Sequence, residues 1–495
     1  MKKTISVFRL LLLSTITLAV ACKQSWLSPA PEDVLIKSDS TFNDPANALK
    51  FVDACYAHLI DWPVSVFSWT GVASITSDDA DKGSDPGDLG TDKDQMDNFT
   101  YGPTTLSPTE VWDGLYVGVG RCNQAIDNVP KFSIDDALKN RLLGEARFLR
   151  AFYYFRLVRI YGDVPLIDKV FSSDSVEQIV AAYTRAPVDD VYNLIISDLQ
   201  FAADNLPLKS EYSAADIGRA TKGAAQGSLA KVYLYKKDWA NAKAMCDAVI
   251  SSGQYSLEPD YAVIWRQSSE NGSESLFEIQ GQNGAEGWGI GGFFTHQGAR
   301  GTVTGGYGGW GFNTPTADLE AAYEPGDVRL KSTIYHRGET LWDGAIVGND
   351  ATNPRYNYKA YVSQTQEINY DDWSSGKNYR VLRYAEVLLI KAEAENELGN
   401  TAEAQNALNQ VRARAELDNT TASAQADLRN AIWQERRVEL AMEYDRFFDL
   451  VRQGRAGTVM RASGKDFVDG KNELFPIPLN QILVSQGRLT QNPGY

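Results

Sequence analysis

Histidine and cysteine are scarce in this sequence, which has three histidines and four cysteines in 495 residues. The histidines (His58, His296 and His336) are scattered and no Cys-x-x-Cys pair occurs, so neither a structural zinc site nor a histidine-based metal centre is expected. Basic residues are also few: 48 Lys and Arg stand against 64 Asp and Glu, a net charge of −16. A nucleic-acid partner, which needs clustered cations, is therefore disfavoured.

Long apolar runs are missing except near the N-terminus. There, residues 10–20 form an apolar stretch that is too short to span a bilayer comfortably but fits the central part of a signal peptide. It follows three basic residues, Lys2, Lys3 and Arg9, and ends in Leu18-Ala19-Val20-Ala21-Cys22. This ending resembles a bacterial lipobox, with the leucine one place earlier than usual.

The N-terminal pattern predicts a signal peptide over residues 1–21, lipidation of Cys22 and a lipidated tether over residues 22–48. The alternative is an ordinary cleaved signal with a coincidental cysteine. Three further cysteines follow, and an odd number leaves at least one unpaired. Each lies in a helical pattern near an apolar face, so buried thiols are expected for all three: Cys55, Cys122 and Cys246.

Helical periodicity is the dominant pattern after the tether. With 43% hydrophobic and 11% aromatic residues, the chain has ample material for a core. A long helix is predicted over residues 142–161, stopped by Gly162 and Pro165. Two segments, 229–249 and 384–415, each read as a pair of helices of about tetratricopeptide-repeat length. The pattern predicts a helical framework in two parts, residues 49–253 and 378–495.

Between residues 254 and 377 helical periodicity nearly vanishes, and glycines and aromatics crowd together. Short apolar runs such as residues 275–279 indicate strands. We therefore expect a mostly α protein: tetratricopeptide-like helix pairs forming one globular domain, which carries a loop-rich lobe with small strands.

This lobe is also the predicted ligand-binding region. Sugar rings present apolar C–H faces that pack on aromatic rings, while their hydroxyls take hydrogen bonds from polar side chains. The ligand-binding candidates are Trp310, Trp288, Tyr307, Phe312, Asn313 and Arg300, with Trp69 as a further candidate outside the lobe. The alternative is that these aromatics fill the core of the lobe itself.

Three other motifs favour simpler interpretations. The Asp-rich stretch 76–99 has almost no apolar residues and predicts a long surface loop. Its carboxylates could hold calcium, but the EF-hand spacing is absent. The alternative is that the loop borders the ligand or a partner protein. The charged helix around residues 435–449 could suggest a carboxylate pair for glycoside hydrolysis, but its spacing favours ion pairs such as Glu443 with Arg446. The glycines of 287–292 match a dinucleotide fingerprint without the helix that must follow, so no cofactor is expected.

Several short stretches, spread over nearly the whole chain, resemble the SusD/RagB family of nutrient-binding lipoproteins. They are Trp112-x-x-Leu115-Tyr116, Gly144-Glu145-Ala146-Arg147-Phe148-Leu149-Arg150-Ala151, Tyr161-Gly162-Asp163-Val164-Pro165-Leu166, Arg383-Tyr384-Ala385-Glu386-Val387-Leu388-Leu389, Glu435-Arg436-Arg437-x-Glu439-Leu440-Ala441, Phe475-Pro476-Ile477-Pro478 and Gln491-Asn492-Pro493-Gly494-Tyr495.

The resemblance implies a lipid-anchored outer-membrane protein that faces the extracellular side. It also implies a partner, a SusC-like TonB-dependent transporter, over whose mouth the protein captures a nutrient, commonly an oligosaccharide. The predicted function is thus non-catalytic binding of an oligosaccharide or related nutrient and its delivery to that transporter. Two alternatives are a surface glycan hydrolase and a peptide-binding scaffold of the tetratricopeptide type.

Overall fold

The computed structural model describes residues 42, 44–86, 88, 92–172, 176–281, 290–367 and 376–495. The signal peptide, Cys22 and almost all of the tether lie outside these residues, so their assignment stays a prediction. No helix in the described part of the chain combines the length and the apolar character needed to cross a membrane.

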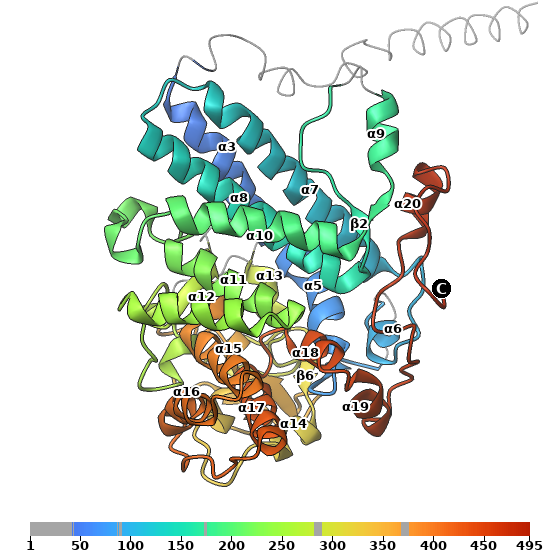
Figure 1. Ribbon diagram of the computed structural model, residues 1–495. Coiled ribbons are helices and arrows are strands. Elements are labelled where there is room, and N and C mark those ends of the chain that lie inside the picture. The colour runs from blue at the N-terminus through green and yellow to red at the C-terminus, as the bar shows by residue number, and fades with distance from the viewer. Residues whose placement is uncertain are drawn as a thin grey trace, which may run out of the picture.

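In the part of the chain that the structure describes, nine long helices form a layered framework in which each helix packs on its neighbours in sequence (Figure 1). They are α3 (Ala46–Ala57), α7 (Leu106–Asn128), α8 (Asp136–Tyr161), α10 (Val188–Asn205), α11 (Lys222–Lys236), α12 (Trp239–Ser251), α15 (Tyr384–Glu397), α16 (Thr401–Arg414) and α17 (Gln425–Glu439). The two predicted helix pairs are α11 with α12 and α15 with α16. The mostly helical fold is therefore confirmed.

Local sequence sets the ends of these helices. The Asp135 carboxylate caps α8 by accepting a hydrogen bond from the Leu138 amide at 2.9 Å, and Gly162, at φ +71°, ends the helix as predicted. Close packing sets their separation: a Cβ atom on Gly118 of α7 would lie 2.5 Å from the ring of Tyr153 on α8. Any larger residue there would push these two helices apart.

The strands among the described residues are short and form five antiparallel pairs. These are β1 (Ala80–Gly83) with β6 (Phe312–Pro315), β2 (Val164–Pro165) with β3 (Arg185–Ala186), β4 (Ser275–Ile279) with β10 (Tyr379–Arg383), β5 (Val303–Thr304) with β8 (Ile346–Val347), and β7 (Ile334–His336) with β9 (Arg355–Asn357). The strand predicted at 275–279 is confirmed as β4. Four of the five pairs involve the lobe.

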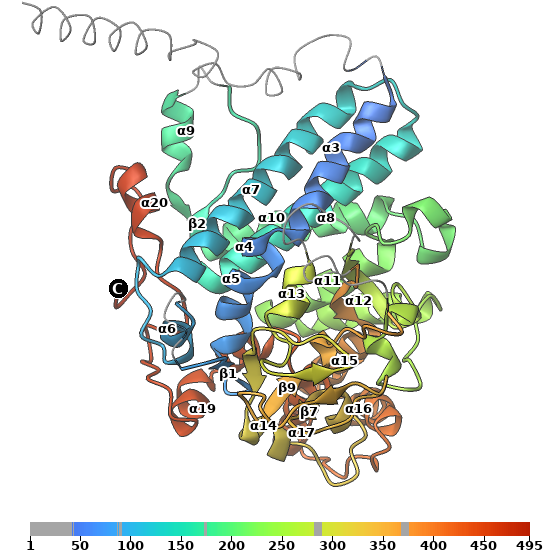
Figure 2. The ribbon, with the colours of Figure 1, turned by 180° about the vertical axis from the view of Figure 1, so that it is seen from behind.

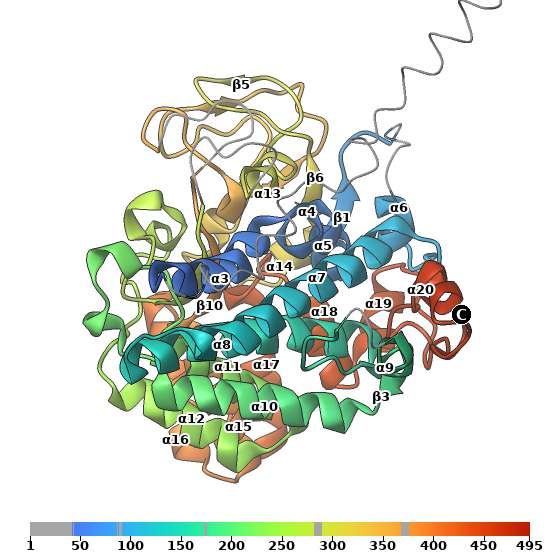
Figure 3. The ribbon, with the colours of Figure 1, turned by 90° about the horizontal axis from the view of Figure 1, so that it is seen from above.

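Short helices complete the chain: α4 (Trp62–Ser65), α5 (Phe67–Thr70), α6 (Lys93–Asp97), α9 (Val176–Ala182), α13 (Gly291–Thr295), α14 (Ala317–Ala321), α18 (Arg446–Arg452), α19 (Ala456–Ala462) and α20 (Leu479–Val484). Seen from behind, the lobe covers the lower part of the helical framework (Figure 2). Seen from above, α13, β5 and β6 lie on one side of α3 to α5, and α8 and α10 lie on the other (Figure 3).

The main core runs from the helical framework into the lobe, where it includes Phe293 and Phe312. The lobe also has a small core of its own, rich in tyrosine, around Tyr335 and Tyr356. Three thiols, those of Cys55, Cys122 and Cys246, are buried and free in the framework.

The Asp-rich stretch differs from its prediction as a surface loop. Residues 76–82 are largely buried, with β1 and α6 formed on either side of Pro86. Asp78 and Asp79 are each only 2% exposed, because Arg446 donates two hydrogen bonds to Asp78, at 2.8 and 2.7 Å, and Arg437 donates one to Asp79 at 2.8 Å. These cations lie some 360 residues further along the chain, so the stretch itself gave no sign of them.

The predicted pair of Glu443 with Arg446 is likewise replaced by more distant partners. Arg446 binds Asp78, whereas Glu443 accepts hydrogen bonds from Arg383 at 2.8 and 2.7 Å and from Lys359 at 2.7 Å. The prediction that the charged residues of 435–449 form ion pairs is confirmed, but the partners of Glu443 and Arg446 lie on other elements of the fold.

A buried ion network around Glu439 joins the lobe to the framework. One Glu439 oxygen lies 2.9 Å from Arg383 and 2.5 Å from Arg414, and the other lies 3.0 Å from Arg329 of the lobe. Burial alone would raise the pKa of Glu439, but these guanidinium groups outweigh it and hold the pKa well below its ordinary value.

We predict that Glu439→Gln lowers the free energy of unfolding by about 3–5 kcal/mol near neutral pH, because it leaves buried guanidinium groups without their shared carboxylate. Since the folded-state pKa of Glu439 is lowered, its contribution is complete above its ordinary pKa of 4.5 and is lost as the pH falls below that value. The difference between wild type and variant in urea unfolding should therefore stay constant from about pH 7 to about pH 5.5 and shrink as the pH falls from about 5 to about 3.

The matched control is Glu403→Gln on the exposed side of α16, which should change the unfolding free energy by less than about 0.5 kcal/mol at any of these pH values. A wild-type-like midpoint for Glu439→Gln at neutral pH would contradict the role given to the network.

Candidate ligand-binding site

Two half-buried tryptophans lie together where the framework meets the lobe. Trp62 opens α4, and Trp310 lies on the loop that leads into β6. Their ring centroids are 6.2 Å apart, with the planes tilted by 52°. Tyr307, three residues before Trp310, is also half-buried. We call the pair Trp62 and Trp310, with Tyr307 on the same loop as Trp310, the aromatic platform.

The platform rests on a buried aromatic layer. The ring of Phe67 lies edge-on to Trp62 at 5.5 Å and to Trp310 at 5.8 Å. Behind it, Phe312 packs at 4.8 Å and His296 at 5.2 Å. Burial lowers the pKa of His296 to about 3, so its imidazole is neutral and adds no charge beneath the platform. The platform rings are therefore held by tight apolar packing.

Backbone hydrogen bonds fix the loop that carries Trp310. The amide of Trp310 donates to the Thr295 carbonyl at 3.0 Å, and those of the neighbouring Gly309 and Gly311 donate to Ala299 and Gly298 at 2.7 and 2.8 Å. The two segments run so close that a Cβ atom on Gly309 would lie 2.3 Å from the Thr295 carbonyl oxygen. Glycine is required at this position to seat the tryptophan.

Polar groups border the platform on the side of β1. Arg300, 38% exposed, forms an ion pair with Asp88 and donates a hydrogen bond to the Ser84 hydroxyl at 2.8 Å. The Ser84 hydroxyl lies 2.7 Å from the Trp310 carbonyl oxygen. The hydrogen bond with Ser84 and the guanidinium of Arg300 lower the pKa of Asp88. Arg300 and Asp88 thus place a cation and an anion beside the platform at neutral pH.

The structure brings two of the predicted site residues together, Trp310 and Arg300, which are linked through Ser84. A third, Tyr307, is half-buried on the same loop as Trp310. Three others lie in the interior. Phe312 is 4% exposed and Trp69 is 2% exposed, while Asn313 is fully buried. Trp288 lies outside the described residues.

These buried residues have structural roles instead. The Asn313 amide donates to Gln297 at 2.8 Å while its backbone has a φ of +56°, a conformation that asparagine tolerates. Trp69 stacks on Phe448 at 6.2 Å. Packing within the core explains why Trp69, Phe312 and Asn313 cannot contact an oligosaccharide at the platform in this conformation.

Trp62 was not among the sequence candidates. It follows Asp61 and precedes Pro63, which occupies the first turn of α4. A proline at this position marks a helix start, where a side chain can reach the surface. The proline therefore predicts where a helix begins, but it does not predict that Trp62 lies beside Trp310, which is 248 residues away in the sequence.

Within the described ranges, no group of three or more His, Cys, Asp or Glu side chains is arranged to hold a metal ion. Calcium binding by the Asp-rich stretch has no support in these residues, because Asp78 and Asp79 are engaged by arginines and Asp97 by Lys465 at 2.5 Å.

Comparison with known proteins shows to which family the chain is similar. A family model described as the SusD family matches residues 273–495, and one described as "Starch-binding associating with outer membrane" matches residues 74–234. SusD-like protein P2 from Formosa agariphila is 31% identical over 447 residues, which cover 83% of this chain and 86% of that protein.

Solved structures agree with the sequence matches. A laminarin binding SusD-like protein has a TM-score of 0.78 and 29% identity, covering 92% of this chain and 100% of that chain. Surface glycan-binding protein A from Bacteroides fluxus has a TM-score of 0.76 and 26% identity, with 92% and 100% covered. Identity along most of a SusD-like relative, combined with the shared fold, establishes that this chain belongs to the SusD family.

Proposed function

We propose that this protein is an outer-membrane lipoprotein that binds an oligosaccharide at the aromatic platform, without cleaving it, and delivers it to a TonB-dependent transporter. The observation that carries the proposal is the pair of half-buried tryptophans, Trp62 and Trp310, held 6.2 Å apart on a rigid aromatic layer. Side chains of this kind give a large contact area with little loss of conformational entropy on binding.

The chemistry of the platform suits a neutral sugar chain. The tilted rings offer apolar faces for the C–H surfaces of successive sugar units, and Arg300 and Asp88 offer hydrogen bonds to hydroxyls. Because sugar hydroxyls exchange water for protein partners at little net gain, most of the affinity has to come from ring stacking. Two similar solved structures, the laminarin binding SusD-like protein and surface glycan-binding protein A, support a glycan as the ligand.

The two alternative functions, a surface glycan hydrolase and a peptide-binding scaffold, receive less support from the structure. The carboxylates of the charged helix that a hydrolase would need, Glu435 and Glu439, are buried and ion-paired with arginines. A peptide-binding scaffold would use the faces of the helix pairs, whereas the platform is formed by α4 and the lobe.

Membrane attachment through Cys22 and docking on a transporter are parts of this proposal that rest on the N-terminal motif and on family membership. The family model described as associating with the outer membrane supports the location. Several acyl chains would anchor the protein stably, since each buried methylene contributes about 0.8 kcal/mol.

We predict that Trp310→Ala weakens binding of laminarin oligosaccharides by about tenfold, because it removes one of two stacking surfaces. The edge of this ring packs on Phe67, so we also expect the free energy of unfolding to fall by about 1–2 kcal/mol, less than for a fully buried tryptophan. Isothermal titration calorimetry and thermal unfolding measure the two effects.

The matched control is Trp239→Ala, which removes another half-buried tryptophan, at the start of α12 in the framework, and should leave binding unchanged. Laminarin is the first probe, followed by other neutral glycans. Unaltered affinity in Trp310→Ala and Trp62→Ala for a glycan that the wild type binds would move the site elsewhere.

Cys22→Ser should release the protein from the membrane fraction without altering its thermal unfolding, because the proposed anchor is the acyl group and α3 begins only at Ala46. Fractionation of cells that express wild type or variant measures this. Equal membrane association of the two proteins would reject the lipid anchor.

Gentle detergent extraction of native membranes should recover the protein with a β-barrel transporter of the TonB-dependent type, at a roughly constant ratio across detergents. Mass spectrometry of the affinity-purified complex identifies the partner. Recovery of the lipoprotein alone in each of several mild detergents would count against the delivery step.

A further inference from the structure

One buried arginine differs from the other buried cations of this protein. Thirteen Lys and Arg side chains are buried in the described residues, and twelve of them lie within ion-pair distance of a carboxylate. Arg156, on α8, is the exception. A buried charge without a counterion is costly, so its surroundings need an explanation.

The surrounding residues compensate the positive charge of Arg156 only in part. Its guanidinium lies 3.9 Å from the ring centroid of Trp69 and 4.2 Å from that of Phe152. It donates one hydrogen bond, to the Val64 carbonyl oxygen. Burial lowers its pKa to about 10, and even so it is charged at neutral pH. Aromatic faces attract a cation, but less strongly than a full negative charge does.

Nearby carboxylates are already engaged by other cations. Asp445 forms ion pairs with Arg159 at 2.9 Å and with Lys231. Glu443 lies 2.7 Å from both Arg383 and Lys359. The charge of Arg156 is therefore the uncompensated one at this place in the fold.

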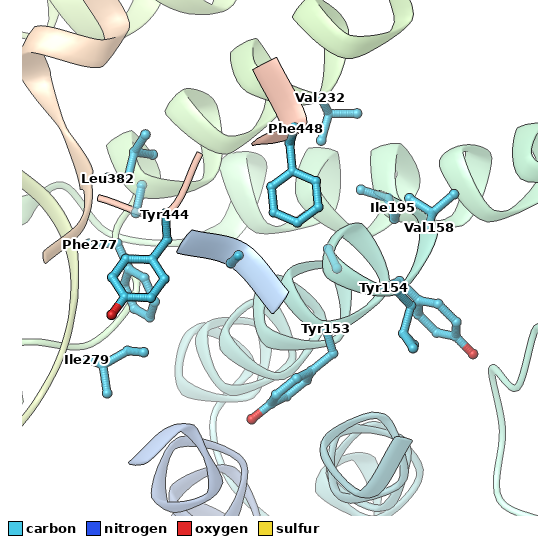
Figure 4. Packing of buried hydrophobic residues seen from close by; sticks show 14 of the residues in the cluster. Tyr153, Tyr154, Val158, Ile195, Val232, Phe277, Ile279, Leu382, Tyr444 and Phe448 are labelled. Atoms are coloured by element: carbon cyan, nitrogen blue, oxygen red, sulfur yellow. The ribbon is translucent and has the colours of Figure 1, made fainter. Parts of the chain in front are cut away.

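A cavity of about 60 Å³ lies beside Arg156, between α8, α11, β10 and the turn before α18. Figure 4 labels three of its lining residues, Val232, Leu382 and Tyr444. The indole N–H of Trp69 also borders it, beside the phenol of Tyr379 but without a well-formed hydrogen bond. The volume exceeds that of a single water molecule, which occupies about 30 Å³ in the liquid.

We propose that this cavity binds a small monovalent inorganic anion, with chloride as its simplest occupant, held by the guanidinium of Arg156 and the indole N–H of Trp69. The anion supplies the missing countercharge for Arg156. Asp445 and Glu443 also line the cavity, but each is already ion-paired, Asp445 with Arg159 and Lys231 and Glu443 with Arg383 and Lys359. The site is separate from the aromatic platform, because Trp69 and Arg156 belong to the core of the framework.

The test is thermal unfolding of the purified protein in sodium chloride and in sodium gluconate, whose anion is too large for the cavity, at equal ionic strength. For wild type, raising chloride from about 10 mM to about 300 mM should increase Tm by about 2 °C more than gluconate does. Arg156→Met, which keeps the length of the side chain and removes its charge, should abolish that difference.

Arg147→Met is the matched control: it lies on the same helix and its guanidinium also stacks on a ring, that of Phe201, but it is 30% exposed and near Asp198. It should keep the chloride response. Equal Tm values for wild type in the two salts, or a chloride response that survives in Arg156→Met, would overturn the proposal.

A second measurement covers the case in which Arg156→Met does not fold. Wild-type crystals soaked in sodium bromide should give an anomalous difference peak within hydrogen-bond distance of the Arg156 guanidinium. A cavity without such a peak, at bromide concentrations that label surface sites, would also overturn the proposal.

Discussion

The pairing of buried arginines with buried glutamates around Glu439 is the interaction on which the arrangement of this molecule depends. Removing several charges from water is costly, and the cost is offset only when every charge has its partners in good geometry. The partners here come from the lobe, from the strand pair β4–β10 and from α16 and α17. Any other orientation of the lobe would leave charges unpaired, so the network specifies one orientation.

This fixed orientation explains how a loop-rich region can hold a binding surface. A loop supplies the half-buried ring of Trp310, but its backbone is tied to neighbouring segments, and the ring packs on Phe67, which in turn packs on Phe312. Binding to rings that are already in position costs little further ordering. The helix pairs contribute no platform residue, because Trp62 lies on the short helix α4; their role is to give the lobe a stiff base.

The helix pairs could be predicted because their signals are local: apolar stripes, a capping Asp135 and a terminating Gly162 are all readable within one helix. Asp78 and Asp79 could not be placed, since the arginines that allow their burial, Arg446 and Arg437, are remote in sequence. The burial of the tryptophans could not be predicted for the same reason. Trp69 and Trp310 are chemically equal in the sequence, and only the packing of distant segments buries one and leaves the other half exposed.

The pairing of β1 with β6 has a consequence for how the protein folds. Ala80 pairs with Pro315 and Gly83 with Phe312, so the chain must close a loop of more than two hundred residues before this ladder can form. Contacts of such long range form late and slow the search for the native state. The helix pairs, whose contacts are local in sequence, can form early, whereas the tryptophan pair can be assembled only after the segments around Trp62 and Trp310 have come together.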